Sequence, residues 1–307
     1  MTSTRSEHTS GLIFGLTAYV LWGLFPFYFA LLDSVSPLEI VAHRVIWSFV
    51  LLSVILLVSR SWPQVLDIVR NRRAAGTLAA AAVFLAINWG IYVYSVASNQ
   101  VVEASLGYFI NPLVSVALGV LLIKERLRRL QWVAVAIAGI AVVELTWAYG
   151  QIPLIGLGLA ISFGIYGLLK KVVGAKALPA LTVETGSLLP LALIYLASME
   201  FLGVAAFATT GWGTGLLLIL LGPVTTLPLL AFGAAATRIP LSTLGLMQYF
   251  TPTFIFLVGI FVFGEQMTPS RWFGFGLIWL GLVIFSVDTI RAARSGRNSS
   301  LAVVEPD

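Results

Sequence analysis

The sequence predicts an all-α polytopic membrane protein in which ten transmembrane helices form two inverted five-helix repeats. Three observations predict this fold class. Of the 307 residues, 59% are hydrophobic and only 10% are charged, which is too apolar for a soluble surface. Ten stretches are long and apolar enough to cross a bilayer, which takes about 20 residues each. Finally, the pattern of residues 104–126 returns at residues 244–266.

The candidate spans divide evenly between two halves of the chain. They lie near residues 11–31, 38–58, 77–97, 102–122, 130–149, 152–171, 181–201, 214–236, 240–262 and 271–290. In the repeated pattern Pro112 aligns with Pro252, and Glu125 aligns with Glu265. Because each half holds an odd number of spans, the second half must enter the membrane from the opposite face. The predicted units are a tail at 1–10, repeats at 11–149 and 152–290, and a tail at 291–307.

The positions of the basic residues predict the orientation. With the N-terminus in the cytoplasm and ten crossings, 16 of the 18 Lys and Arg residues lie on the inner side. Arg271 lies outside, and Arg44 lies within a span. This distribution follows the positive-inside rule, so we expect both termini to be cytoplasmic. It also accounts for the pI of about 9.6, and nucleic acid is therefore not an expected partner.

Several spans contain helix breakers. Trp22 and Gly23 lie within the first span, and Pro112 within the fourth. A proline frees a backbone carbonyl one turn earlier, which is tolerated at mid-depth only against protein or a water-filled cavity. Gly222 and Pro223 predict a second interrupted helix in the eighth span.

Ionisable residues cluster at the start of the second span. Glu39 and His43 share one helical face, and Arg44 follows directly. In one interpretation Arg44 reaches the outer headgroups and Glu39 lies at the interface. In the other, these residues line a polar cavity that opens outward.

The repeat pairs His43 with a second ionisable residue. At the 141-residue offset that aligns spans one and six, His43 falls on Glu184. Histidine, with a reference pKa of about 6.5, can change charge near neutral pH. We therefore predict that Glu39, His43 and Glu184 couple transport to protons, with Arg44 as an anchor for a substrate carboxylate or as the partner of Glu39. The alternative is that His43 is a packing residue and that Glu184 lies at the interface near Lys176.

Polar and aromatic side chains at mid-depth form the predicted substrate site. Asn88 and Tyr92 lie on one face of their span, where packing between helices and a cavity lining are equally good interpretations. Amide and aromatic groups suit an uncharged or zwitterionic organic solute with some apolar surface. The predicted substrate-binding residues are Trp22, Arg44, Asn88, Tyr92, Tyr108, Asn111, Gln248 and Tyr249.

The composition argues against an enzyme. The chain has no cysteine, and its two histidines are His8 and His43. A zinc centre or a histidine-based triad would need ligands that the chain hardly has. We therefore expect no catalytic residues, no metal and no cofactor.

Several motifs together resemble the RarD-type branch of the EamA family, in the drug/metabolite transporter superfamily. The resemblance covers roughly residues 11–290. The motifs are His43-Arg44-Val-Ile-Trp-Ser, Asn88-Trp89, Ser105-Leu-Gly-Tyr-Phe-Ile-Asn-Pro-Leu, Glu125-Arg-Leu, Gly222-Pro-Val-Thr-Thr-Leu-Pro-Leu, Gln248-Tyr-Phe-Thr-Pro and Gly264-Glu.

This resemblance implies a secondary transporter of the bacterial plasma membrane. It implies a permease or exporter that moves a small organic solute, metabolite or drug by alternating access, with the lipid bilayer and protons as further partners. It fixes neither the substrate nor the direction of transport, and it leaves a homodimer open. The alternative is a passive channel or a membrane receptor, because inverted repeats with broken helices also occur in channels.

Overall fold

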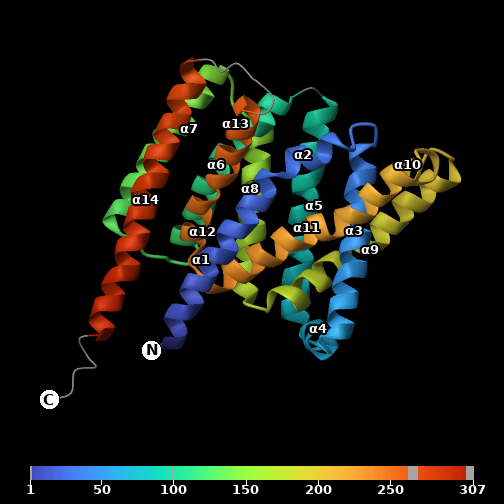
Figure 1. Ribbon diagram of the computed structural model, residues 1–307, viewed down its shortest axis with the longest axis horizontal. Coiled ribbons are helices and arrows are strands. Elements are labelled where there is room, and N and C mark those ends of the chain that lie inside the picture. The colour runs from blue at the N-terminus through green and yellow to red at the C-terminus, as the bar shows by residue number, and fades with distance from the viewer. Residues whose placement is uncertain (1, 99, 262–268, 302–307) are drawn as a thin grey trace.

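The computed structural model describes residues 2–98, 100–261 and 269–301, and these residues form helices and connecting turns without strands (Figure 1). The helices of the first half are α1 (Thr2–Gly23), α2 (Phe25–Ala30), α3 (Pro37–Val58), α4 (Trp62–Arg70), α5 (Arg72–Ala97), α6 (Val101–Leu121) and α7 (Arg129–Tyr149). Those of the second half are α8 (Leu154–Val173), α9 (Ala177–Phe201), α10 (Ala206–Thr209), α11 (Trp212–Arg238), α12 (Leu241–Met247), α13 (Phe250–Phe261) and α14 (Pro269–Leu301).

Each predicted span coincides with a helix or with two consecutive helices. In the described part of the chain, eight helical segments are long and apolar enough to cross a membrane. The apolar part of α6, Leu106–Leu121, is shorter, and the predicted ninth span is divided between α12 and α13. The protein is thus an all-helical multi-pass membrane protein, while the number of ten crossings stays a prediction.

The breaks between helices agree only in part with the breaks that the sequence predicts. The predicted break in the first span is confirmed, because α1 ends at Gly23 and α2 begins at Phe25. The predicted interruption of the eighth span is wrong, because α11 continues through Pro223 and Pro228. Neighbouring helices can hold a proline-containing helix together in a membrane, and α11 is packed against α1 and α3.

The helix ends also differ from the predicted tails. Helix α1 begins at Thr2 and α14 extends to Leu301, so the described parts of the predicted tails, 2–10 and 291–301, are helical, and their place outside the membrane stays a prediction. The start of α1, the end of α14 and the short helix α4 all lie at the lower end of the bundle in Figure 1. We call this the inner end, and the opposite end the outer end.

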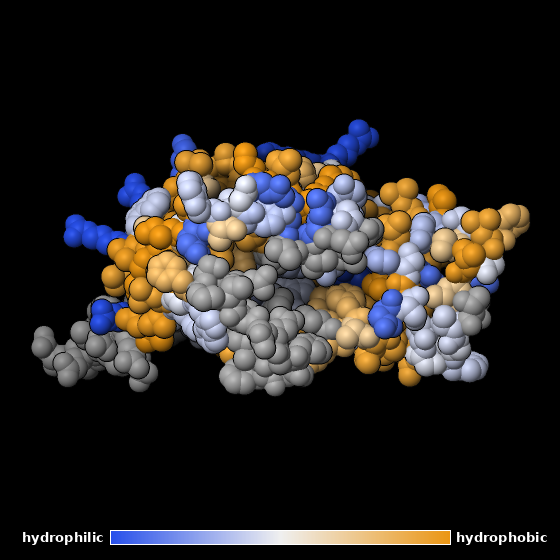
Figure 2. All heavy atoms as spheres, turned by 90° about the horizontal axis from the view of Figure 1, so that it is seen from above, coloured by the Kyte–Doolittle hydropathy of each residue, from blue (hydrophilic) through white to orange (hydrophobic). Residues whose placement is uncertain are grey.

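The two halves are interlocked through small residues. Helix α6 packs against α8, and α3 packs against both α9 and α11. A Cβ atom placed on Gly107 would lie 2.9 Å from the carbonyl oxygen of Gly156, and one on Gly222 would lie 2.7 Å from that of Trp47. Only glycine permits backbones to approach so closely. Large apolar side chains face outward instead, as the orange surface in Figure 2 shows.

Two glutamates fix the starts of two helices in the second half. The Glu103 carboxylate accepts the Ile155 amide at 2.7 Å, at the start of α8. Glu125 accepts the Leu241 and Ser242 amides at 2.7 and 2.8 Å, at the start of α12. A carboxylate stabilises a helix N-terminus because it satisfies free N–H groups and complements the helix dipole.

Candidate functional site

Arg44 is the centre of the polar region inside the bundle. It lies on α3, two turns below the outer end, where it is partly buried. Its Nε donates a hydrogen bond to Thr225 Oγ1 of α11 at 2.9 Å. No acidic side chain in the described ranges forms an ion pair with it. The pairing with Glu39, one of the two roles expected of Arg44, is therefore not formed, and the guanidinium has no counter-ion among the described residues.

Aromatic rings surround this guanidinium. Its Cζ lies 4.3 Å from the ring centroid of Trp89 on α5, and 5.9 and 5.8 Å from those of Phe25 and Phe29 on α2. Such contacts stabilise a cation by about 0.5–2 kcal/mol each, most when the site is dry. The aromatic rings thus offset part of the desolvation of Arg44, but they cannot neutralise it.

Two tyrosines complete the surroundings of Arg44. Tyr92 and Tyr108 both interact electrostatically with its guanidinium. Tyr108 is 40% exposed and Tyr92 is 39% exposed, so neither side chain is fully enclosed by the protein. Arg44, Trp89, Tyr92, Tyr108 and Thr225 are called the Arg44 site below.

Glu39 and His43 lie close to Arg44 in sequence but make different contacts. Both are buried. Glu39 Oε1 accepts the amides of Ala206 at 2.7 Å and Phe207 at 3.4 Å, and so fixes the start of α10. His43 stacks on the Phe207 ring, with centroids 5.4 Å apart. The Glu39 carboxylate therefore contacts α10 and not the Arg44 guanidinium.

The contacts of His43 fix its tautomer. Its Nδ1 accepts the indole N–H of Trp47 at 3.1 Å. Because an indole nitrogen only donates, the neutral imidazole carries its proton on Nε2. That nitrogen lies 3.8 Å from Glu39 Oε1 and has no hydrogen-bond partner.

Glu184, which aligns with His43 in the repeat, lies near the inner end. The Lys170 Nζ is 2.6 Å from Glu184 Oε1, and both side chains are buried. The Tyr166 hydroxyl donates to Glu184 Oε2 at 3.2 Å. The lysine that pairs with Glu184 is Lys170, whereas Lys176 was the expected neighbour, and the carboxylate is buried by protein. Lys170, Glu184 and Tyr166 are called the inner ion pair below.

The other predicted site residues join helices to one another. The Asn88 amide donates to the Leu159 carbonyl at 2.8 Å and to Ser162 Oγ at 3.1 Å. Gln248 Nε2 donates to Ser115 Oγ at 3.1 Å. Their partners lie on α8 and α6, so both amides contribute to packing between the halves.

Two predicted amide oxygens remain without a partner. Asn111 Oδ1 and Gln248 Oε1 are both buried without a hydrogen bond. Leaving a buried acceptor unpaired costs about 1–3 kcal/mol. These two atoms are therefore available to a ligand or to water.

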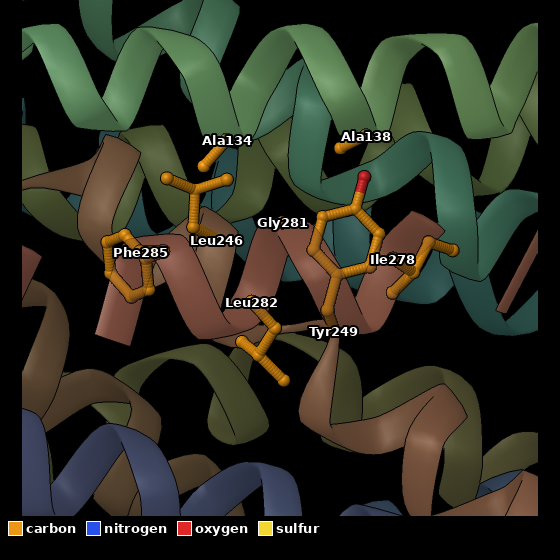
Figure 3. A pocket seen from close by; sticks show the side chains of 8 residues that line it. All are labelled: Ala134, Ala138, Leu246, Tyr249, Ile278, Gly281, Leu282 and Phe285. Carbon is orange, nitrogen blue, oxygen red and sulfur yellow. The ribbon is translucent and has the colours of Figure 1, made fainter. Parts of the chain in front are cut away.

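Trp22 and Tyr249 lie in apolar surroundings. Trp22 contacts the rings of Phe163 and Phe232, each with its centroid 5.7 Å away. The Tyr249 hydroxyl donates to the Phe109 carbonyl at 3.1 Å. Its ring lies in a crevice between α7 and α14, beside Ala138 and Ile278 (Figure 3). This crevice has no room for a water molecule, so it is a packing seam.

Sequence reasoning missed several residues around Arg44. Thr225, Phe25 and Phe29 were not among the expected site residues, and Trp89 entered only as part of a motif. Phe25 and Phe29 repeat at a four-residue spacing beside a helix break, which could have indicated a common face. Glu265 and Gly264 of the repeated motif lie outside the described residues.

The comparisons with known proteins agree with a membrane transporter. The profile of the EamA-like transporter family matches the chain twice, over residues 9–147 and 151–287. Protein RarD of Streptomyces exfoliatus is 48% identical over 95% of this chain and 93% of its own. An uncharacterized transporter of Vibrio cholerae is 43% identical over 97% and 99%. The chloramphenicol-sensitive protein RarD of Pseudomonas aeruginosa is 32% identical over 92% and 96%.

A solved structure shares the fold. It is described only as the crystal structure of a protein, and it covers 93% of this chain and 99% of its own with a TM-score of 0.69. At 17% identity this likeness concerns the fold alone.

The helical fold and the transporter names of the relatives indicate a membrane transporter. The chain belongs to the EamA-like transporter family, and the predicted resemblance to its RarD-type branch is confirmed by relatives of that name.

Proposed function

We propose that the protein is a secondary transporter that moves a small organic solute across the bacterial plasma membrane. Its two five-span halves are inverted repeats, and alternating access exposes one site between them to either side. The observation that carries this proposal is the Arg44 site, a polar region inside an apolar bundle, with Arg44 and Thr225 contributed by different halves. Ionisable groups inside a membrane usually mark a substrate or ion pathway.

The contacts between helices support the inverted repeat. In the proposed inverted repeat, each long helix of the first half has a counterpart in the second half. The corresponding helices are α1 and α8, α3 and α9, α5 and α11, α6 and the pair α12–α13, and α7 and α14. The packing of α5 on α8 then corresponds to that of α11 on α1, and both are present. Likewise α3 packs on α11 and α9 on α5.

Close approaches repeat in the same way. A Cβ atom on Gly164 would lie 2.8 Å from Val114, and one on Gly23 would lie 2.6 Å from Phe254. Gly23 aligns with Gly164 at the 141-residue offset, and Val114 with Phe254 at the 140-residue offset. A pseudo-twofold axis in the membrane plane would produce this correspondence.

We infer that the structure represents an outward-facing state. Tyr92 and Tyr108 lie near the outer ends of α5 and α6 and are 39% and 40% exposed. The inner end, in contrast, is joined by the inner ion pair and by Glu125 at the start of α12. In alternating access, these inner contacts would open as the outer ones close.

Reconstitution in liposomes tests the transport function. Because a relative is named for chloramphenicol sensitivity, chloramphenicol is the first solute to measure, followed by a panel of amino acids and aromatic metabolites. Accumulation above the external concentration under an imposed pH gradient or membrane potential is expected. Flux that only dissipates a gradient would favour a passive channel, and binding without flux would favour a receptor.

Two variants test the predicted site within the same assay. Asn111→Ala and Gln248→Ala each remove an unpaired buried oxygen, and we expect transport to be lost while expression is kept. Ser187→Ala, at an exposed hydroxyl of α9, is a control that should transport normally. Normal transport by both amide variants would place the solute elsewhere.

Cysteine labelling tests the proposed orientation, in which both termini are cytoplasmic. The chain has no native thiol, so a single introduced cysteine reports its own side. Residue 73 lies at the inner end, whereas Trp212 lies at the start of α11 and is 97% exposed. An impermeant maleimide added to intact cells should label Trp212→Cys but not Arg73→Cys. Labelling of Arg73→Cys alone would reverse the orientation.

We also propose that transport is coupled to protons through His43, with Glu39 and Glu184 as the associated carboxylates. The Glu39 carboxylate 3.8 Å from His43 Nε2 supports this role, because it would stabilise the imidazolium formed when Nδ1 takes up a proton. In liposomes with an imposed pH gradient, His43→Gln should lose gradient-driven uptake. Undiminished uptake would remove His43 from the mechanism, and insensitivity of the wild type to the gradient would remove the proton.

A further inference from the structure

The Arg44 site combines a partly buried cation with two tyrosines that are 39% and 40% exposed. Arg44 has one protein hydrogen bond, from Nε to Thr225. Its two terminal nitrogens have no hydrogen bond to the described residues. Holding a cation at such depth without a counter-ion is unfavourable. An anionic ligand would remove this cost, and the free edge of the guanidinium presents two parallel N–H donors to it.

The surroundings of the guanidinium define the body of the ligand. Trp89 covers one face of it at 4.3 Å, while Phe25 and Phe29 flank it at nearly 6 Å. Tyr108 keeps 40% of its surface open beside the same group. A ligand bound to Arg44 would therefore place an apolar or aromatic body against these rings.

The charges nearby define the charge of the ligand. His43 is the next residue, but it faces Phe207 and Trp47 and carries no positive charge as a neutral acceptor. Lys170 is already neutralised by Glu184. Arg44 is thus a single uncompensated cation, which balances one negative charge. A planar carboxylate fits a guanidinium fork with one charge, whereas a phosphate dianion would leave a net negative charge inside the membrane.

The site offers little to a ligand ammonium group. The acidic residue on the same helix, Glu39, accepts two amides of α10. The face of Trp89 is already covered by Arg44. A zwitterion would therefore bring a cation for which the Arg44 site has no free carboxylate. This observation separates amino acids from simple organic acids.

We propose that the Arg44 site binds organic monocarboxylates with an aromatic or apolar body, and that the Arg44 guanidinium holds the carboxylate. This inference rests on the proposed transport function and narrows its substrate class from small organic solutes to monoanions. It differs from the predicted uncharged or zwitterionic solute and agrees with the predicted role of Arg44 as an anchor for a substrate carboxylate.

Binding to purified protein tests the proposal without any transport. The probes are benzoate, 3-phenylpropionate and indole-3-acetate, each compared with its amide, which has the same shape but no charge. Phenylalanine and phenyl phosphate serve as the zwitterion and the dianion. Isothermal titration in nanodiscs should give at least one carboxylate that binds about 10- to 100-fold more tightly than its amide, as expected for a hydrogen-bonded charge. The zwitterion and the dianion should bind more weakly than that carboxylate.

Substitutions at Arg44 assign the binding to this residue. Arg44→Gln should remove the preference for carboxylate over amide, and Arg44→Lys should keep part of it, because a lysine retains the charge but not the fork. The inner-end variant Arg238→Gln, outside the Arg44 site, should keep the wild-type preference. Size-exclusion chromatography checks that each variant is folded.

Chemical modification gives a second measurement on the wild-type chain. Phenylglyoxal modification of Arg44, followed by mass spectrometry, should be slowed by the preferred carboxylate and not by its amide. The proposal is overturned if no carboxylate binds more tightly than its amide, if the preference survives in Arg44→Gln, or if the carboxylate gives no protection.

The same measurements separate this inference from the proposed function. Binding of a carboxylate without flux in liposomes would keep the anion site and reject transport. Concentrative flux of neutral solutes that is unchanged in Arg44→Gln would keep transport and reject the anion site.

Discussion

The inner ion pair and the Arg44 site differ in how they compensate a cation inside the bundle. The inner ion pair supplies a carboxylate, and the Arg44 site does not. Lys170 lies 2.6 Å from Glu184, and both are buried, so the pair is neutral and closed. Arg44 is surrounded by aromatic rings and one threonine hydroxyl, with no carboxylate among the described residues. A buried charge that is matched within the protein joins helices, whereas an unmatched one is available to a ligand. The difference distinguishes a structural charge from a binding charge.

Breaking the inner ion pair should have the largest effect on stability. Lys170→Met leaves the Glu184 carboxylate buried without a counter-ion, which should lower the free energy of unfolding by about 3–5 kcal/mol. The double variant Lys170→Met/Glu184→Leu should regain most of this loss, because both charges are removed together. Denaturant titration in detergent, followed by circular dichroism, measures both. Equal stability of the single and double variants would contradict the assignment.

The substitution Gly222→Ala should push α3 away from α11. It should disturb the Arg44 site and not the inner ion pair. The Cβ atom in Gly222→Ala would lie 2.7 Å from the Trp47 carbonyl oxygen. We expect a loss of about 1–3 kcal/mol through overpacking, together with weaker carboxylate binding. Gly90→Ala is the control, since no atom lies within 4 Å of its new Cβ, and it should not destabilise the protein. A similar loss in both variants would mean that backbone approach is not the cause.

Removing the Glu39 carboxylate should loosen the outer end but not the inner one. Glu39→Ala leaves the Ala206 and Phe207 amides without an acceptor, which should cost about 1–2 kcal/mol. Hydrogen exchange should speed up at these two amides and stay unchanged at Leu241 and Ser242, which Glu125 holds. Glu39→Gln, which keeps an acceptor oxygen, should show a smaller change. Faster exchange at both ends would indicate general unfolding.

The smallest effect is expected from Trp47. Trp47→Phe removes the indole donor to His43 Nδ1, a loss of about 0.5–1.5 kcal/mol. Nitrogen NMR of the histidine should show that Nδ1 no longer accepts a hydrogen bond. Trp132→Phe, at a 51% exposed position, should leave the histidine signal unchanged. An unchanged signal in both variants would show that the Trp47 bond is not formed.

The sequence predicted the helices well because apolar length and charge bias depend on the bilayer alone. The family and the positions of the helices followed from such local patterns. The partners of individual side chains could not be predicted in this way. Glu39 meets Ala206, which is 167 residues away, and Arg44 meets Thr225, which is 181 residues away. Only the packing of α3 against the second half brings these groups together.

The same limit explains why the predicted site was too broad. Asn88 and Gln248 have the composition of ligand-binding residues, but each amide also holds a neighbouring helix. The spacing of polar residues on a helix does not distinguish these two roles. Arg44 differs from them because the described residues leave its charge unmatched.

The hydrogen bonds of Glu125 have a consequence for biosynthesis. This residue fixes the start of α12 through Leu241 and Ser242, so the ribosome must add 117 further residues (242 minus 125) before both amides exist. At about 5–20 residues per second, that delay lasts roughly 6–23 s. The first half is complete once residue 149 is added, but its glutamate still lacks both partners for the rest of this interval. The nascent chain therefore depends on the translocon and surrounding lipid until the second half arrives.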